Sequence, residues 1–317
     1  MSELSTAVQS ALTDCLKVRK NESVLILADE PLSDLGYAFH EGTKALSKNP
    51  MLVVIPEMSN HGSEPPKGVA AMMMDSDVIV LLTSRSLSHT KARRKASQRG
   101  ARIASLPGVT KTSLLRTMIG DYRDMISKSR KVADILTIGR SAQLTNPAGT
   151  NLTFSLTRMK GHADTGMIHE NGKFSNLPAG EGSAAPTAES TNGVLVVDGS
   201  FPEIGKLKIP IRMTVKNGYV VRITGCNDAD TIRTLLRPFG RPGRNIAEVG
   251  IGTNPYAKFT GCTLEDEKVM GNIHVALGNN ISFGGKIAVR CHYDAVLLKS
   301  TLVIDGKTIV ENGVLQV

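Results

Sequence analysis

Ser23-Val-Leu-Ile-Leu-Ala28 is a short apolar run, and similar runs recur through the first part of the chain. Two of them, Met51–Ile55 and Asp77–Leu82, are separated from their neighbours by segments with helical periodicity. Apolar strands that alternate with helices predict a parallel sheet covered by helices on both faces. We therefore predict that residues 1–138 form an α/β domain with a Rossmann-like parallel sheet.

This α/β pattern carries no nucleotide-binding motif. A GxGxxG loop does not follow the first predicted strand, and GxxxxGK[ST] occurs nowhere in the sequence. Such glycine-rich loops bring backbone amides close to the phosphates of a dinucleotide or of ATP. The expected similarity to Rossmann domains is therefore one of topology alone.

The character of the sequence changes near residue 139, where apolar and polar residues begin to alternate. Alternation of this kind predicts strands that are buried on one face. The clearest stretches are Leu152–Leu156, Gly193–Val197, Leu207–Ile211 and Tyr219–Ile223. Asn-Gly and Asp-Gly pairs, which favour hairpin turns, stand at 171–172, 192–193, 198–199, 217–218 and 305–306. We predict that residues 139–317 form a β-rich α+β domain.

The chain is basic, with a formal net charge of +9 over 317 residues. Its densest basic run, Lys91–Arg99, has helical spacing and ends at Gly100. Such a run is most simply the solvated face of a helix, with cations near the C-terminal end where the dipole favours them. No signature of a nucleic-acid-binding fold accompanies it. We predict no nucleic-acid partner, and an anionic small molecule or an acidic partner stays open.

The cysteines indicate a reducing compartment. Cys15, Cys226, Cys262 and Cys291 are scattered and show no CxxC pairing, so they do not form a disulfide framework. No apolar run approaches the roughly 18 residues of a membrane span. The N-terminus lacks the basic and apolar regions of a signal peptide. We predict a cytoplasmic protein that does not associate with a membrane.

Acids and histidines interrupt the apolar runs of the last quarter of the chain. Glu248 and His274 each stand in a strand-like apolar run, and His292 and Asp294 lead into a third. Residues i and i+2 of a strand share one face, so His292 and Asp294 would lie together. Burying such groups is costly unless they are paired or coordinated. A metal ion would satisfy all of them at once, and we predict a metal site here.

Two further acids belong to this candidate site. Glu181 stands in a turn rich in glycine and proline, and Glu267 in a small acidic cluster ahead of His274. Each residue also has a simpler explanation. The acids would be solvated in exposed turns, His274 would be a core histidine bonded to a backbone carbonyl, and the residues at 292 and 294 would be a surface pair.

In their order and spacing, these residues resemble the M29 metalloaminopeptidase family, the aminopeptidase T group. The resemblance runs from the Asn176–Glu181 turn to the final Asp-Gly pair. It implies a two-metal site that holds Zn, Co, Mn or Fe, a hydrolase acting on amides or short peptides, and a homodimer. The ligands it implies are Glu181, Glu248, Glu267, His274, His292 and Asp294.

At a two-metal site of this kind, the ions would share a bridging carboxylate and a water molecule. Glu248 is the better candidate for the bridge, because a strand fixes its position. Glu181 is either the group that passes a proton to the leaving amine or only a ligand. The family places a catalytic tyrosine shortly after the histidine that matches His274, and this chain has Asn280 or Ile281 there. The peptidase machinery is therefore incomplete in this sequence.

A related branch of the superfamily contains mononuclear iron dioxygenases that open dihydroxypyridine rings. In that branch a histidine matches Glu248, and the residues matching Glu181 and His274 are not kept. Because this chain keeps all three peptidase-type residues, we predict the hydrolase and hold a non-haem Fe(II) dioxygenase as the alternative. In the alternative, His274, His292 and Asp294 would form a 2-His-1-carboxylate triad. A binding protein without activity is the third possibility, and metal content separates the three.

Overall fold

The computed structural model describes residues 2–317, and these divide into two compact units. The first unit holds the residues up to Asp121 together with Gly166–Ala179. The second holds Tyr122–Thr165 and Gly180–Val317. The contacts thus divide the chain differently from the predicted boundary between residues 138 and 139. The long helix before that boundary belongs to the second unit, and a short segment returns to the first.

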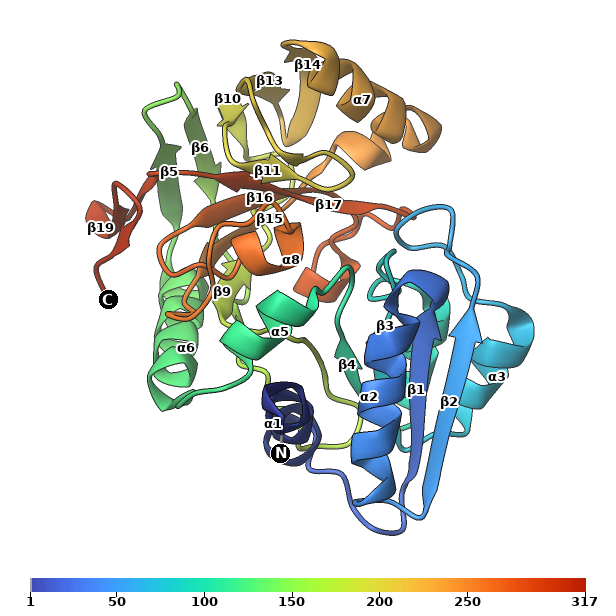
Figure 1. The fold of residues 1–317 in the computed structure, drawn as a ribbon. Helices are drawn as coiled ribbons and strands as arrows, with labels where there is room; N and C mark the ends of the chain where they lie inside the picture. The colour runs from blue at the N-terminus through green and yellow to red at the C-terminus, as the bar shows by residue number, and fades with distance from the viewer. Residues whose placement is uncertain (1) are drawn as a thin grey trace. The chain divides into compact units, whose positions relative to one another are not determined.

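The first unit is built on a parallel sheet in the strand order β2-β1-β3-β4-β8 (Figure 1). Its strands are β1 (Ser23–Asp29), β2 (Asn49–Ile55), β3 (Val78–Leu82), β4 (Arg102–Ser105) and β8 (Phe174–Asn176). Its helical segments are α1 (Glu3–Ser10), η1 (Ala11–Cys15), η2 (Glu30–Leu32), α2 (Ser33–Lys44), α3 (Lys67–Met74), α4 (Lys91–Gln98) and α5 (Lys111–Thr117).

The central strands of this parallel sheet are covered on both faces. Every residue of β3 is buried, as are all residues of β1 except the first. Met73 of α3 and Ala96 of α4 pack with β1, β3 and β4 in one core cluster, while α2 contacts β1 and β2. Strands of a covered parallel sheet are expected to be apolar on both sides. The predicted α/β fold is confirmed.

A buried arginine ties the segment that follows the N-terminal helices to β4, an inner strand of this sheet. The guanidinium of Arg102, on β4, donates to both carboxylate oxygens of Glu22 at 2.8 and 2.9 Å. It also donates to the carbonyl oxygens of Leu16 and Lys17 at 3.1 and 3.2 Å. The planar guanidinium group can donate to all of these acceptors at once. The ammonium group of a lysine could not, because it is a compact point charge.

We expect Arg102→Lys to lower the free energy of unfolding by about 1.5–3 kcal/mol, because it removes paired hydrogen bonds to a charged partner. Urea unfolding at neutral pH measures this loss. Arg99→Lys, at an exposed position of the same unit, is the matched control and should change the stability little. Equal stability of the two variants would contradict the structural role of Arg102.

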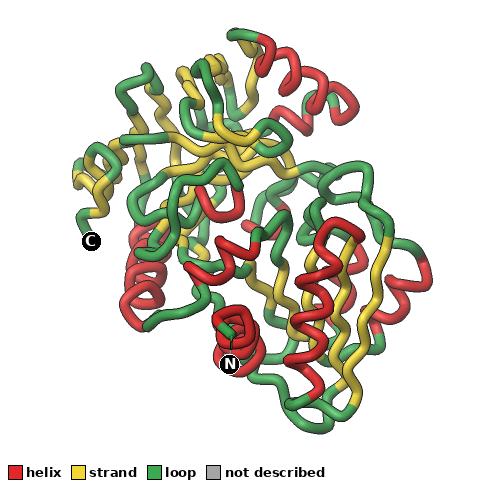
Figure 2. The backbone as a smooth tube through the Cα atoms, in the orientation of Figure 1, coloured by secondary structure: helices red, strands yellow, loops and turns green. Residues whose placement is uncertain are grey.

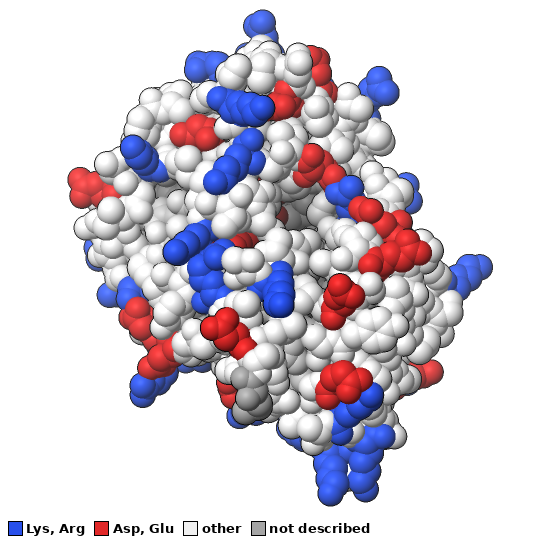
Figure 3. Space-filling model, viewed as in Figure 1, with Lys and Arg blue, Asp and Glu red and all other residues white. Residues whose placement is uncertain are grey.

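The basic run at Lys91–Arg99 forms α4 and is not solvated throughout. Arg93 is buried, its Nε donates to the carbonyl of Ser88 at 2.6 Å, and its guanidinium lies 4.3 Å from the centre of the Phe174 ring. Burial lowers the pKa of Arg93 to about 10. On the face drawn in Figure 3, basic and acidic side chains are interspersed. The absence of a nucleic-acid partner stays a prediction.

The second unit contains two antiparallel sheets and a β11-β12 hairpin. The large sheet has the order β14-β13-β10-β6-β5-β18-β19-β20, and the small sheet the order β17-β16-β15-β9-β7. The strands are β5 (Ser141–Thr145), β6 (Asn151–Ser155), β7 (His162–Asp164), β9 (Glu181–Ala184), β10 (Asn192–Val197), β11 (Ser200–Phe201), β12 (Gly205–Lys206), β13 (Ile211–Lys216), β14 (Tyr219–Thr224), β15 (Ile246–Gly252), β16 (Ile273–Gly278), β17 (His292–Leu297), β18 (Thr301–Ile304), β19 (Lys307–Glu311) and β20 (Val314–Leu315).

Helices are few in this unit (Figure 2). They are α6 (Arg123–Ile138), α7 (Asn227–Leu236), η3 (Arg237–Phe239), η4 (Pro242–Arg244), α8 (Thr263–Asp266) and η5 (Ile281–Phe283). Val132 and Leu136 of α6 join the core that the two sheets share. Close approach of α6 to β9 needs Gly182, since a Cβ there would lie 2.5 Å from a methyl carbon of Val132. This packing is why α6 belongs to the second unit.

The shared core takes one face of the small sheet. Val249 of β15, Val275 of β16 and Ala295 of β17 are buried in it with Leu144 and Leu195 of the large sheet. The residues between them alternate to the opposite face. The predicted β-rich domain is confirmed, and its small sheet has a second face available for polar side chains.

Three details of the predicted strands are wrong. Leu207–Pro210 lie outside any strand and β13 begins at Ile211, because Pro210 has no N–H for a sheet ladder. Asn192-Gly193 starts β10 instead of forming a turn. The pairs at 171–172 and 198–199 connect strands of different sheets, so only those at 217–218 and 305–306 close hairpins.

Within residues 2–317, none of the helices has the length and apolar character that a membrane span requires.

Candidate metal centre

The second face of the small sheet gathers the predicted site residues on neighbouring strands. Ala276 of β16 lies between Glu248 of β15 and Asp294 of β17 in the strand register. His292 pairs with Gly278. Paired residues of adjacent strands point to the same face. Small residues on the middle strand therefore leave room for the larger polar groups on both sides.

The same pattern places His274 and Glu181. His274 of β16 pairs with Gly250, and Glu181 of β9 pairs with Gly252. The imidazole of His274 lies directly over Gly250, where a Cβ would come within 2.1 Å of the ring carbon Cε1. Only glycine at position 250 therefore allows the ring to lie flat against β15.

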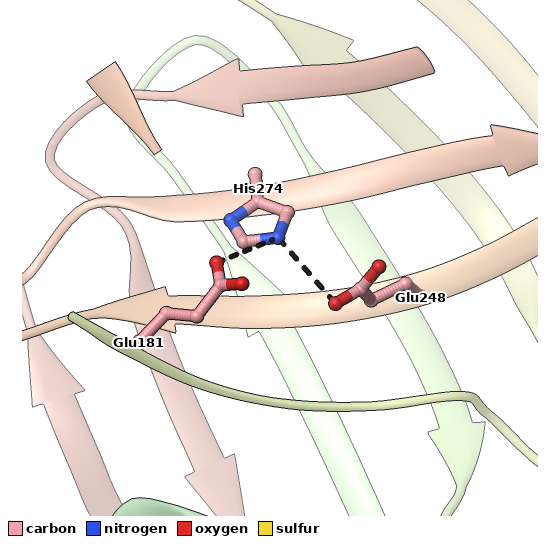
Figure 4. Close-up of side chains that lie close together, drawn as sticks. All are labelled: Glu181, Glu248 and His274. Atoms are coloured by element: carbon pink, nitrogen blue, oxygen red, sulfur yellow. Dashed lines mark ion pairs between the residues drawn. The ribbon is translucent and has the colours of Figure 1, made fainter. Parts of the chain in front are cut away.

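Figure 4 shows the imidazole of His274 between the carboxylates of Glu181 and Glu248. Its Nε2 lies 3.5 Å from Oε2 of Glu181 and 3.9 Å from Oε1 of Glu248. Asp294 approaches the same nitrogen, with Oδ1 at 4.0 Å. His274 is 1% and Glu248 2% exposed. At such burial, charged groups must be paired or coordinated.

His292 meets the other oxygen of Glu248. Its Nε2 lies 3.1 Å from Oε2 of Glu248 and 3.2 Å from Oδ1 of Asp294. Its Nδ1 lies 2.8 Å from the backbone carbonyl oxygen of Asn279. A histidine that binds a metal commonly donates its second ring N–H to such a carbonyl, which fixes the ring and leaves the other nitrogen facing the ion.

The protonation states of His274, His292 and Glu248 depend on one another. Burial by itself would raise the pKa of Glu248, but hydrogen bonds from both histidines hold it well below its usual value. Burial would lower the pKa of His274, but Glu248 and Glu181 raise it to about 9. Burial also opposes the charge of His292, whose pKa is raised well above its usual value by Asp294 and Glu248. Protons on the imidazoles thus balance the carboxylates, a part that a metal ion takes when it binds.

A lysine lies at the other end of the cluster. Lys268 is 1% exposed, and its Nζ lies 2.8 Å from Oε1 of Glu181, 2.9 Å from Oε1 of Glu267 and 3.6 Å from Oδ2 of Asp164. Burial lowers the pKa of this ammonium group, but the carboxylates raise it well above the usual value. Burial, Asp294 and Glu181 together raise the pKa of Glu267 to about 8.

Aromatic rings lie beside His292. The Phe283 ring, on η5, stacks on the His292 ring with centroids 5.7 Å apart, and it meets the His162 ring edge-on at 5.6 Å. Burial lowers the pKa of His162. Its Nε2 has no hydrogen-bond partner among residues 2–317. An apolar ring and a neutral imidazole therefore flank the candidate ligands.

The structure brings all six predicted site residues together. Among the described residues, three sets of side chains offer ligand atoms within 4.8 Å of one another. They are Glu181 with Glu248 and His274, Glu248 with His292 and Asp294, and Glu267 with His274 and Asp294. Each set holds one histidine, so the anticipated triad of His274, His292 and Asp294 is not among them. Imidazole and carboxylate donors suit Fe(II), Mn, Co and Zn.

Four residues that contact the candidate ligands or each other at this site were not predicted from the sequence. Lys268 directly follows the acids Glu265, Asp266 and Glu267, and a single lysine at the end of this acidic cluster was the available signal. Asp164 and His162 come from the short strand β7, whose sequence carries no recognisable pattern. Phe283 precedes Gly284 and Gly285, and the sequence indicated only that this glycine turn lets the backbone approach a ligand closely.

The sequence model of NicX, described as 2,5-dihydroxypyridine 5,6-dioxygenase, matches residues 3–317. The chain belongs to the NicX family. No curated protein sequence matches this chain significantly.

Two solved structures share the fold. The 2,5-dihydroxypyridine dioxygenase from Pseudomonas putida KT2440 superposes with a TM-score of 0.82 at 21% identity, over 99% of this chain and 98% of that one. AmpT from Thermus thermophilus superposes with a TM-score of 0.69 at 16% identity, over 99% of both chains. The resemblance to aminopeptidase T therefore extends to the fold.

The prediction of a hydrolase is wrong, and with it the assignment as an aminopeptidase or metalloprotease of the M29 family. The NicX match over nearly the whole chain overturns it. The prediction rested on Glu181, Glu248 and His274 as peptidase-type residues. In sequence, an acid that faces a lysine looks the same as one that faces a metal ion, and Glu181 contacts Lys268. The broader predictions of an enzyme and of a metal-binding site agree with the family and with the cluster.

Proposed function

We propose that this protein is a non-haem Fe(II) dioxygenase that opens the ring of a hydroxylated nitrogen heteroaromatic compound, such as 2,5-dihydroxypyridine. The observation that carries the proposal is the NicX match over residues 3–317, in a chain whose buried cluster offers imidazole and carboxylate ligands. The family's description names the bond between ring positions 5 and 6 as the one that is cleaved.

Glu248, His292 and Asp294 are the residues that would hold the ion. They fit Fe(II) because they combine one imidazole with two carboxylates, and because the carbonyl of Asn279 already orients the His292 ring. When bound, Fe(II) supplies the one-electron chemistry that lets dioxygen react with an aromatic ring. Asp294 is the more accessible carboxylate, with 21% of its side chain exposed against 3% for Glu248.

Phe283 and His162 would act on the organic substrate. The Phe283 ring, stacked on His292, offers an apolar surface against which a flat heteroaromatic ring packs beside the metal ligands. Nε2 of His162 is available to accept a proton from a ring hydroxyl, since burial lowers the pKa of this imidazole and keeps it neutral. A substrate bound as a phenolate donates electrons to oxygen more readily than the neutral phenol.

The decisive experiment measures oxygen consumption. The protein is first loaded with Fe(II) in the absence of oxygen. On addition of 2,5-dihydroxypyridine and air, we expect one O2 to be consumed per substrate and both oxygen atoms to appear in a ring-opened acid. Mass spectrometry with ¹⁸O2 measures their incorporation. Protein loaded with Zn(II) is the control and should consume none. If Fe(II) protein consumes no oxygen with this compound or with other hydroxylated pyridines and pyrimidines, the proposal fails.

A further inference from the structure

We propose that the ammonium group of Lys268 takes the place of a second metal ion, so that each chain binds a single ion at Glu248, His292 and Asp294. The inference rests on the proposed function, in which one ion lies at these three residues, and adds the residue that keeps a second ion out. Lys268 thus acts as an internal cation. Its positive charge neutralises Glu181, Glu267 and Asp164, as a second metal ion bound to these acids would.

The contacts of Nζ are those of a cation that holds acids together. Oε1 of Glu181 and Oε1 of Glu267 lie 2.8 and 2.9 Å from it, and Oδ2 of Asp164 lies 3.6 Å away. A metal ion bound to the first two oxygens would lie about 2.0–2.2 Å from each. An ion between these two oxygens would compete with Nζ for both of them and would meet the repulsion of like charges.

The three ligand sets differ in whether Lys268 already engages them. One contains Glu181 and another contains Glu267, and both of these carboxylates contact Nζ. The acids that Lys268 pairs with are Glu181, Glu267 and Asp164, and none of these belongs to the set of Glu248, His292 and Asp294. This set is therefore the one whose acids Lys268 does not neutralise. His274 lies between the two regions, with its Nε2 3.5 Å from Oε2 of Glu181, the oxygen that Nζ does not contact.

The backbone holds Lys268 in this position. Its N–H donates to the carbonyl oxygen of Glu265 at 3.0 Å, and its own carbonyl oxygen accepts from the N–H of Asn254 at 2.9 Å. The segment also lies tightly against β15, because a Cβ at Gly252 would come within 2.7 Å of the carbonyl carbon of Lys268. The side chain starts from a fixed point next to the acids, so its ammonium group is a built part of the site.

Metal stoichiometry tests the proposal without any measurement of activity. Metal-free wild type and Lys268→Met are titrated with Mn(II), and bound metal per chain is measured by elemental analysis together with electron paramagnetic resonance. We expect one ion per wild-type chain with the spectrum of an isolated ion. Lys268→Met should bind two ions per chain and give the spectrum of an exchange-coupled pair. Lys307→Met, at an exposed position of β19, is the matched control and should bind one.

Thermal stability gives a second measurement. Without metal, Lys268→Met should unfold at a lower temperature than the wild type, because three acids lose their cation, and Mn(II) should raise its Tm more than that of the wild type. Two ions in the wild type, or one in Lys268→Met, would overturn the proposal and leave the metal-dependent function in place. No bound ion in the wild type would overturn both. If Lys268→Met does not fold, the wild-type stoichiometry decides alone.

Discussion

His292→Ala is expected to weaken Fe(II) binding by more than about 100-fold, since even residues that only orient a ligand contribute 10–100-fold. His292 is the one imidazole of the set that also contains Glu248 and Asp294. Its loss leaves two carboxylates, an arrangement typical of weaker sites for harder ions. Oxygen consumption with 2,5-dihydroxypyridine should fall below detection at Fe(II) concentrations that saturate the wild type. Competition with a chromophoric chelator measures the affinity.

The matched control is His169→Ala. His169 belongs to the first unit, where its Nε2 lies 2.6 Å from the carbonyl oxygen of Asp14. This variant should bind Fe(II) as the wild type does. If His292→Ala keeps wild-type affinity and loses only turnover, the residue serves the substrate and another set holds the ion. Circular dichroism on both variants checks that the fold is intact.

The candidate site could be predicted as far as strand geometry allows. The two-residue spacing of His292 and Asp294 fixes them to one face of β17, and polar residues in apolar runs marked Glu248 and His274. Strand register could not be read from sequence, yet it places Gly250 under His274 and Ala276 between Glu248 and Asp294. The contacts of Lys268 with Glu181 and Asp164 join segments far apart in the chain, and no local pattern announces them.

The function was harder to predict because the fold does not distinguish the candidates. A dioxygenase and an aminopeptidase both superpose over nearly the whole chain. One fold commonly hosts different chemistries, and the site decides among them. The order of the residue types along the chain favoured the hydrolase. In the structure, Glu181 and Glu267 pair with Lys268, whereas Glu248 pairs with His292. Only the structure supplies those partners.

Glu248→Gln should lower the free energy of unfolding of the metal-free protein by about 3–5 kcal/mol, the usual cost of breaking a buried ion pair. The carboxylate of Glu248 faces both imidazoles, at 3.1 Å from His292 and 3.9 Å from His274. A glutamine of the same shape leaves two buried imidazolium groups without this partner. Urea unfolding in the presence of a chelator measures the difference. Glu311→Gln, at an exposed position, is the control.

The effect should depend on pH with a definite sign. The pKa of Glu248 is lowered from 4.5, so its contribution is present above pH 4.5 and is lost as the pH falls through the lower, folded-state pKa. The pKa of His274 is raised from 6.5 to about 9, so its contribution is complete below pH 6.5 and is lost as the pH rises through 9. The stability difference between wild type and Glu248→Gln should therefore be largest between pH 4.5 and 6.5.

The stabilisation by bound metal should show the opposite pH dependence. Fe(II) or Mn(II) must displace the proton from Nε2 of His292, so metal affinity rises with pH while the proton-dependent pairing weakens. In the wild type, added metal should then stabilise the protein more at pH 8 than at pH 6. Glu248→Gln lacks a ligand as well as an ion-pair partner, so metal should stabilise it less than the wild type at both pH values. A stability difference that is flat from pH 4.5 to 9, with metal-free protein, would mean that Glu248 is not paired with the histidines.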